Sequence, residues 1–491
     1  MKDLLARFDV AMVSAPKRYP VHPPFDPPAA YPELSRLELG CDAENGVYAA
    51  VRESFHLLAL DDANYGTAQW NPLGDLIHSG DRVLLKPNFV LHRNFGQGPL
   101  EAVVTHGAVI RAVADYALLA LAGKGMLTIG DAPQMNCDLD TLFRGIGMHE
   151  VCAYLERQAR KSGVEFRMVD FRQEQTQYKF GIVWKRRKLS GGEGTRIVQL
   201  GRESHMEGID AERLYGADYA RQTTIKAHLG HRHEYCIAVE LLQADVVISM
   251  PKLKVHSKVG TTLNVKNMVG VNTDKNHLAH YRIGPRERGG DEFSNPAWDD
   301  VADRVLMDRL LGRNWAVGKY PFVAWRVVRR LITKGRRPAN RSFVHGNWHG
   351  NDTAWRMALD LNEVVLAADR DGKLHKAPVR RYFSVIDGIV AGQGDGPLHP
   401  DAYAAGAIVA GFNPLAVDWI ATLAMGFDPK KIPMYQRGAE QMQRWHQQFD
   451  PSLCRALSNN LEWQERLASS TPIFRFEPAP GWKGMIETAR A

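Results

Sequence analysis

The chain has 491 residues, 45% hydrophobic and 24% charged, which is the composition of an ordinary globular protein of two or three domains. Its net charge of +7, from 62 basic and 55 acidic residues, admits acidic substrates and is too small to indicate nucleic-acid binding. The five cysteines show no CxxC spacing, which argues against a disulfide framework, a zinc knuckle or an iron–sulfur cluster.

The predicted compartment follows from what the chain lacks. No apolar run approaches the roughly 18–20 residues that a membrane span needs. The N-terminal segment is interrupted by Asp3, Arg7 and Asp9, so it makes a poor signal peptide. We therefore expect a cytoplasmic protein.

Strands and helices are predicted to alternate along most of the chain. A buried strand at 83–85, a helix that starts near Thr105 and a strand at 126–129 form a βαβ unit with a parallel sheet. Further strands are predicted at 165–169, 246–248 and 382–386, with helices at 351–368 and 414–425. These elements predict an α/β fold with two lobes, mainly parallel sheets flanked by helices, and a cleft at the carboxyl ends of the strands.

Domain limits are predicted from changes in pattern. Residues 1–79 form an arm and a helix, 80–430 the α/β core, and 431–491 a helical extension. Two insertions interrupt the core. Residues 178–200 contain two strand-like runs around KRRKLSGGEGTR, which predicts a β-hairpin. Residues 315–341 combine aromatic and basic side chains, so this amphipathic helix either lies on an anionic membrane surface or packs on the body with a solvated basic face.

The segment 244–270 contains the strongest candidate site. A buried strand ends at Pro251, and the residues after it are rich in charged and small polar side chains: Lys252, Lys254, His256, Lys258, Gly260, Thr261, Thr262, Asn264, Lys266 and Asn267. We predict a strand, a ligand-facing loop and a helix that places Lys266 towards the cleft.

Polar residues follow several predicted strands in the same way. They occur at Lys86-Pro87-Asn88, Gly130-Asp131, 251–256 and Asp387-Gly388. Because the carboxyl ends of parallel strands meet at one crevice, we expect these segments to share a site. The alternative for any one of them is a simple turn.

Roles follow from side-chain chemistry. His256, Lys266 and His106 are predicted to be catalytic, although His106 could equally cap a helix. The predicted substrate-binding residues are Lys86, Asn88, Thr105, Lys254, Thr261, Thr262, Asn264 and Asn267. The predicted cofactor-binding residues are Lys266, Asp131, Asp387, Gly392 and Gly394, and the predicted metal ligands are His256, His277 and His280. The run GQGDGP lacks the Lys-Ser/Thr ending of a P-loop and is only a weak phosphate signal.

The segments VLLKPNFV, VTHGAVIRAV, TIGDAP, DVVISMPKLKVH, TTLNVKNMVG and FSVIDGIVAGQGDGP resemble the DUF362 family of bacterial and archaeal proteins over roughly residues 80 to 425. The family's biochemical role is largely unassigned, so the resemblance implies an architecture more than a reaction. Many members carry a four-cysteine iron–sulfur segment that this chain lacks, so no built-in cluster is expected.

A weaker resemblance is to the nickel-pincer lactate racemase family. The order and spacing of His256, Lys266 and then His277 or His280 are similar, which implies a metal ligand or base, a covalent tether and further histidines. The Asp- and Arg-rich N-terminal motif of that family is not reproduced at Lys86-Pro87-Asn88. The implied cofactor is a divalent metal or a nickel-pincer-like nucleotide.

Two functions remain open at this point. The first is an isomerase- or racemase-like enzyme that transfers a proton or hydride on a small anionic or hydroxylated substrate. The second is a non-catalytic or membrane-surface component of a cell-envelope polysaccharide system, docked on the inner face of the membrane through 315–341. We expect no nucleic-acid partner, and a homo-oligomer fits either function.

Overall fold

The computed structural model describes residues 4–189, 192–295, 297–332, 343–441 and 449–488. Its centre is a sheet with the strand order β17-β1-β16-β14-β10-β2-β3-β4. Along this path, within the described residues, only β16 runs antiparallel to its neighbours. The strands are β1 (Asp9–Ser14), β2 (Arg82–Pro87), β3 (Met126–Asp131), β4 (Glu165–Asp170), β10 (Val246–Met250), β14 (Arg381–Asp395), β16 (Ala407–Gly411) and β17 (Arg455–Leu457).

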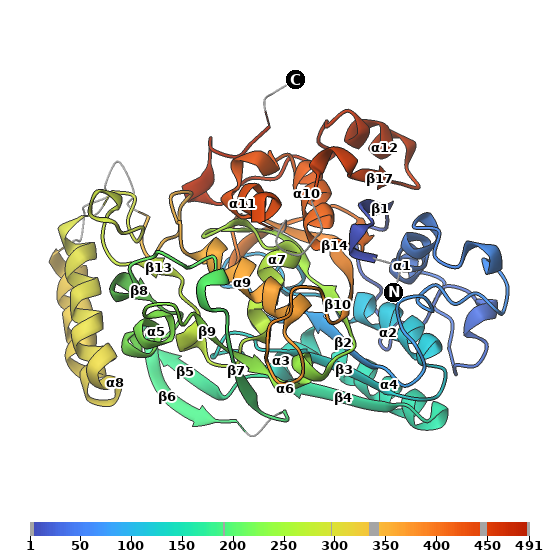
Figure 1. Ribbon diagram of the computed structural model, residues 1–491, viewed down its shortest axis with the longest axis horizontal. Coiled ribbons are helices and arrows are strands. Elements are labelled where there is room, and N and C mark those ends of the chain that lie inside the picture. Colours follow the sequence, from blue (N-terminus) through green and yellow to red (C-terminus); the bar gives the residue numbers. More distant parts are fainter. Residues whose placement is uncertain (1–3, 190–191, 296, 333–342, 442–448, 489–491) are drawn as a thin grey trace.

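Helices cover both faces of this sheet (Figure 1). Alternate side chains of each strand point to opposite faces, so Val83 and Leu85 pack in one core and Leu84 in another. One face carries α1 (Gly46–Leu57), α2 (Gly107–Leu121), α3 (Leu139–Gly145) and α4 (Met148–Ser162). The other carries α6 (Val239–Gln243), α7 (Leu263–Asn267), α9 (Ala354–Ala367), α10 (Pro414–Met425) and α11 (Pro433–Gln441).

The predicted α/β fold with a mainly parallel sheet is confirmed. The parallel strands form one continuous sheet rather than one sheet in each lobe, because β10 pairs with β2 on one side and with β14 on the other. Smaller elements lie around this core: α5 (Arg221–His228), α12 (Leu461–Ala468), β7 (Thr195–Gln199), β8 (Leu214–Tyr215), β9 (Glu234–Ala238), β13 (Tyr281–Arg282) and β15 (His399–Tyr403).

Two segments predicted as loops are strands. The residues after Pro251 form β11 (Lys252–His256), which pairs with β14 and then with β12 (Gly260–Thr261). The strand predicted to end near Asp387 continues through the glycine-rich run, because β15 and β11 supply pairing partners as far as Asp395. Both differences arise from partners that are distant in the sequence.

The predicted hairpin insertion is present, with a different turn. Strands β5 (Glu174–Lys179) and β6 (Ile182–Lys188) pair across Phe180 and Gly181, which both have positive φ angles. The later strand β7 pairs with β9 instead. The turn therefore precedes the basic KRRK run, which lies at the end of β6.

The second insertion is a helical hairpin within α8 (Trp298–Ile332); residues 333–341 of the predicted helix lie outside the described residues. At Asn314 the backbone leaves the helical region, with φ −156° and ψ 90°. The two arms then run side by side, since Arg329 forms ion pairs with Asp299, Asp300 and Asp303 of the first arm. In Figure 1 this hairpin (yellow) stands at the left edge of the molecule.

The outward face of the second arm is apolar, which differs from the solvated basic face that one of the two sequence-based interpretations predicts. Its exposed side chains include Val317, Tyr320, Val327, Val328, Leu331 and Ile332. Arg326 and Arg329 instead face the acidic first arm. None of the helices among the described residues has the length and apolar character needed to cross a membrane.

Candidate functional site

A cavity of about 650 Å³ lies at the carboxyl ends of the parallel strands. Segments that follow β2, β3 and β10 form one wall, as the topology predicts. The two insertions and the loop at 343–347 form the opposite wall. Residues that represent these walls are Asn88, Asp131 and Lys254 on the first side, and Tyr178, Met307 and His345 on the second.

Lys266 lies in the short helix α7 and lines the cavity. The helix starts at Leu263, whose φ of 39° is uncommon for a residue other than glycine. The carboxylate of Asp418, from α10, accepts hydrogen bonds from the backbone N–H groups of Asn264 and Val265 at 2.8 and 2.9 Å. A buried acid from another helix therefore caps α7 and fixes the direction of Lys266.

The Lys266 amine is the least compensated charge of the site. Among the described residues, no acceptor forms a hydrogen bond or ion pair with its Nζ atom, although only 8% of the residue is exposed. Burial, together with the positive charges of Lys275, Lys258 and Lys86, lowers its pKa to about 7. Near neutral pH, the protonated and the neutral form of this amine are therefore both populated.

Three more lysines line the same cavity, and each donates to a backbone carbonyl. Lys254 donates to Val103 at 2.6 Å, Lys275 donates to Ala132 at 2.7 Å, and Lys258 donates to His345. Burial lowers the pKa values of Lys258 and Lys275 to about 8. A carbonyl oxygen accepts a hydrogen bond from a lysine ammonium group, but it carries no full negative charge to neutralise that group. These lysines therefore leave positive charge uncompensated in the cavity.

Two imidazoles of the cavity have opposite hydrogen-bonding roles. Nδ1 of His256 accepts from the backbone N–H of Lys258 at 3.1 Å, so its Nε2 carries the proton. Nδ1 of His280 lies 2.9 Å from the carbonyl oxygen of Leu278 and must donate, so its Nε2 is a free acceptor. Burial, first of all, and the nearby lysines lower both pKa values well below the usual range, which keeps both rings neutral.

A buried ion pair forms the floor beneath these groups. Lys86 Nζ lies 2.8 Å from Asp131 Oδ1, and it also donates to Asn267 Oδ1 at 3.0 Å. Gly270 allows this close packing, since a Cβ atom there would lie 1.9 Å from Asp131 Oδ1. Asp131 and Asn267 line the cavity, whereas Lys86 is fully buried below it. The oxygen atoms Asn88 Oδ1 and Thr262 Oγ1 are buried and have no partner among the described residues.

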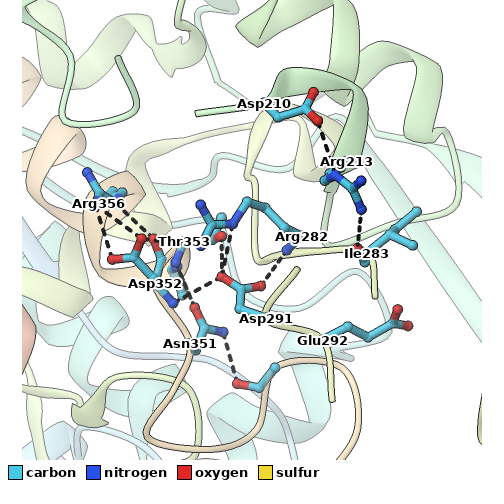
Figure 2. Close-up of polar contacts among 12 residues, drawn as sticks. Asp210, Arg213, Arg282, Ile283, Asp291, Glu292, Asn351, Asp352, Thr353 and Arg356 are labelled. Carbon is cyan, nitrogen blue, oxygen red and sulfur yellow. Dashed lines mark hydrogen bonds and ion pairs between the residues drawn. The ribbon is translucent and has the colours of Figure 1, made fainter. Parts of the chain in front are cut away.

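A polar network braces the wall that carries His280 (Figure 2). Asp291 accepts from the backbone N–H of Arg282 at 2.5 Å and from the hydroxyl of Thr353 at 2.6 Å. Asn351 donates to the carbonyl of His280 at 3.0 Å. These contacts join the start of α9 to the strand that follows His280. They hold the His280 imidazole at its position in the cavity.

The structure places several predicted site residues elsewhere. The residues that do not line the cavity are Thr105, His106, Thr261, Asn264, Asp387, Gly392 and Gly394, together with the buried Lys86. Asp387 forms an ion pair with Lys252 at 3.0 Å, and His106 stacks on Tyr19 with a centroid distance of 3.9 Å. Thr105, Thr261 and Asn264 form hydrogen bonds inside the core. These groups support the framework and do not face the cavity.

The three predicted metal ligands do not lie together. His256 and His280 line the cavity, whereas His277 does not. Its Nδ1 atom lies 3.3 Å from Cys236 Sγ and 3.3 Å from Asp274 Oδ2. The i, i+3 spacing of His277 and His280 suggested a shared helix face. The helix ends at His277, so the two rings point to different surroundings.

Other cavity residues carried no sequence signal that we recognised. They are Lys275, Tyr215, Tyr281, His345 and Asn347. Lys275 stands in an ordinary polar run, and His345 follows an insertion with no strand or motif before it. Their positions depend on how the insertions fold over the sheet.

Comparison with known proteins gives a family. The model of the family described as "Domain of unknown function (DUF362)" matches residues 83–191 and 193–422, which is more than half of the chain. The "Thylakoid-associated protein sll1697" of Synechocystis sp. is 23% identical over 364 residues, which cover 74% of this chain and 68% of that protein.

Proposed function

Because the chain belongs to the DUF362 family, whose description assigns no function, we propose its function from the cavity: it is an enzyme that binds a small anionic or hydroxylated substrate and transfers a proton on it. One observation supports this most directly. The partner-free amine of Lys266 shares a cavity with one imidazole that donates and one that accepts a hydrogen bond.

Anion recognition follows from the charge of the cavity. Lys254, Lys258, Lys266 and Lys275 line it. Of its three acidic residues, Asp131 is paired with the buried Lys86, Asp218 is paired with Arg186, and Asp395 is exposed. A carboxylate or phosphate would reduce the repulsion among the lysines and supply the acceptor that Lys266 lacks. The unpaired oxygens of Asn88 and Thr262 suit a substrate hydroxyl.

Proton transfer follows from the two tautomers. The free Nε2 of His280 is suited to remove a proton from carbon or oxygen, and Nε2–H of the neutral His256 is suited to donate a hydrogen bond to the reacting oxygen. The protonated amine of Lys266, with a pKa of about 7, is suited to return a proton. Lys266 in its charged form would stabilise negative charge on the reacting oxygen. This arrangement supports an isomerase- or racemase-like reaction, in which one group removes and another returns a proton.

The same residues fit the cofactor that the lactate racemase resemblance implies. A nickel-pincer-like nucleotide would be held by Lys266, whose amine is free and faces a cavity of about 650 Å³. When bound, this group would supply hydride-transfer chemistry. His256 would still donate a hydrogen bond, and His280 would still accept a proton. Intact-mass measurement of the purified chain decides this point, because a covalent group on Lys266 adds mass that disappears in Lys266→Arg.

The enzyme proposal is tested by binding and by exchange. Pyrophosphate and small hydroxy acids should raise the melting temperature of the wild type, with little effect on Lys266→Met. Lys124→Met, at an exposed position away from the cavity, is the matched control and should respond like the wild type. In D₂O, a hydroxy acid that binds should gain deuterium with the wild type and not with His280→Gln. Equal responses of wild type and Lys266→Met would contradict the proposal.

The helical hairpin α8 favours a second candidate, a component docked on a membrane surface. Val317, Tyr320 and Leu331 are 65%, 60% and 66% exposed along one face of its second arm. At the tip of the neighbouring β-hairpin Phe180 is 60% exposed, and the Trp184 ring joins the two insertions through an edge contact with Tyr320. Apolar and aromatic side chains on one helix face are typical of interfacial membrane binding. The name of the Synechocystis relative, a thylakoid-associated protein, agrees with this candidate.

Co-sedimentation with vesicles tests the second candidate. The wild type should sediment with vesicles that contain phosphatidylglycerol, and the triple variant Val317→Asp, Tyr320→Asp, Leu331→Asp should remain in solution. Leu461→Asp, at a 77% exposed position on α12, should bind like the wild type. If the wild type and the triple variant sediment equally, α8 is not a membrane-docking element.

A further inference from the structure

The segment that carries Lys275 and His280 into the cavity is fastened by a cluster outside it. Cys236 lies in β9, Asp274 is the N-cap of the 3-10 turn η8 (Lys275–His277), and His277 ends that turn. The three ligand atoms, one each of sulfur, oxygen and nitrogen, all lie within 4.8 Å of one another. Among the described residues, the structure brings no other such group of three together.

The contacts within this cluster converge on one atom. Cys236 Sγ and Asp274 Oδ2 both lie 3.3 Å from the same atom, Nδ1 of His277. A protonated Nδ1 donates to the carboxylate and also faces the sulfur, which is only a weak acceptor. Two of the three ligand atoms therefore share a single proton of His277.

A cation between the three atoms could take a lone pair from each of sulfur, oxygen and nitrogen, because these atoms all lie within 4.8 Å of one another. We propose that Cys236, Asp274 and His277 bind a divalent transition-metal ion of the zinc class. Thiolate, imidazole and carboxylate are the ligands that zinc takes in proteins, and three protein ligands leave the fourth position to water. The His277 and Asp274 side chains are 13% and 27% exposed, so that position can open to solvent.

The ion would fix the cavity wall. The backbone N–H of Thr273 donates to the carbonyl of Cys236 at 2.7 Å, so β9 and the segment already meet at this point. Lys275 lies between two of the ligands, and His280 follows three residues after His277. The metal is thus assigned a positioning role in holding the residues of the proposed enzyme site, and its binding does not depend on that enzyme activity.

The test uses the full chain after treatment with a chelator. Zinc should bind at one equivalent per chain by elemental analysis, and cobalt(II) should give a thiolate-to-cobalt charge-transfer band. Cys236→Ser and Asp274→Asn should both abolish the band, and Asp274→Asn keeps the shape of the side chain if the cysteine variant folds poorly. Cys137→Ala, at a buried cysteine outside the cluster, is the control and should keep it.

Three outcomes would overturn the inference: no stoichiometric metal in the wild type, no charge-transfer band with cobalt, or metal retained by both ligand variants. His280→Gln separates this inference from the proposed function, because it alters the cavity and none of the three ligands. That variant should keep the metal even if it loses proton exchange.

Discussion

Anion binding in the cavity should weaken as Lys266 loses its proton. With a pKa of about 7, this side chain is about 90% protonated at pH 6 and about 10% protonated at pH 8. If only the charged form binds an anion, the apparent affinity falls about tenfold between these pH values, which is about 1.4 kcal/mol. A bound anion would also raise the pKa of Lys266, so binding should take up a proton.

Sulfate is a suitable ligand for this measurement, because its charge does not change between pH 6 and pH 8. Thermal stabilisation by sulfate, against chloride at equal ionic strength, gives the dissociation constant at each pH. The Lys266→Arg side chain stays protonated from pH 6 to pH 8. The tenfold fall in sulfate affinity that is due to Lys266 should therefore be absent in this variant. The shallower dependence that remains in this variant would come from Lys258 and Lys275, whose pKa values are about 8.

Lys266 does not control anion binding if sulfate binds the wild type and Lys266→Arg with the same pH dependence. The same conclusion follows if Lys266→Met binds sulfate as tightly as the wild type at pH 6, because the charge of Lys266 would then be irrelevant. A wild-type affinity that rises with pH would show that the sign is wrong.

Three further predictions concern stability, measured by chemical denaturation. Lys266→Met should raise the free energy of unfolding by up to about 5 kcal/mol at pH 6 and by about 2 kcal/mol at pH 9. The gain shrinks because the unfolded wild type binds more protons than the folded wild type between pH 7 and pH 10.5, so the wild type becomes more stable as the pH rises through this range. An equal gain at both pH values would contradict this. Asp418→Ala should lower stability by roughly 3 kcal/mol, since it leaves three buried donors at the start of α7 unpaired, and a change below about 1 kcal/mol would disprove the capping role. Gly270→Ala should cost roughly 2–4 kcal/mol by displacing the Lys86–Asp131 pair, and an unchanged melting temperature would show that the floor adapts.

The framework was predictable because its signals are local. An apolar run such as 246–248 is typical of a strand that is buried in a parallel sheet. The start of a helix can be predicted from the capping residue and the few residues after it. Asn413 followed by Pro414, for example, starts α10, with the Asn413 side chain accepting from two backbone N–H groups of the first turn. The position of the cavity at the strand ends follows from topology alone.

The segment after Pro251 shows where sequence reasoning failed. The density of lysines in this segment predicts a loop. The segment is a strand, in which Leu253 and Val255 alternate with Lys252, Lys254 and His256. The apolar residues pack in the core, and all three polar residues are nonetheless buried. Burial of three basic side chains on one strand depends on partners from distant parts of the chain, which no local pattern reveals. His345, in the loop after the second insertion, was beyond sequence reasoning for the same reason.

Four lysines near the strand ends, Lys86, Lys252, Lys254 and Lys266, are buried, and they differ in one respect that bears on function. Lys86 lies 2.8 Å from Asp131, and Lys252 lies 3.0 Å from Asp387, so each buried charge has a carboxylate partner that offsets its desolvation. Lys254 donates to the carbonyl oxygen of Val103. Lys266 has neither a carboxylate nor a carbonyl partner among the described residues, and the nearby charges that lower its pKa are all positive. A charge held in this way destabilises the fold, as the Lys266→Met prediction states, and packing alone does not account for it. An anionic ligand would supply the carboxylate or phosphate that the chain itself supplies for Lys86 and Lys252, which is the physical reason for assigning the binding role to Lys266.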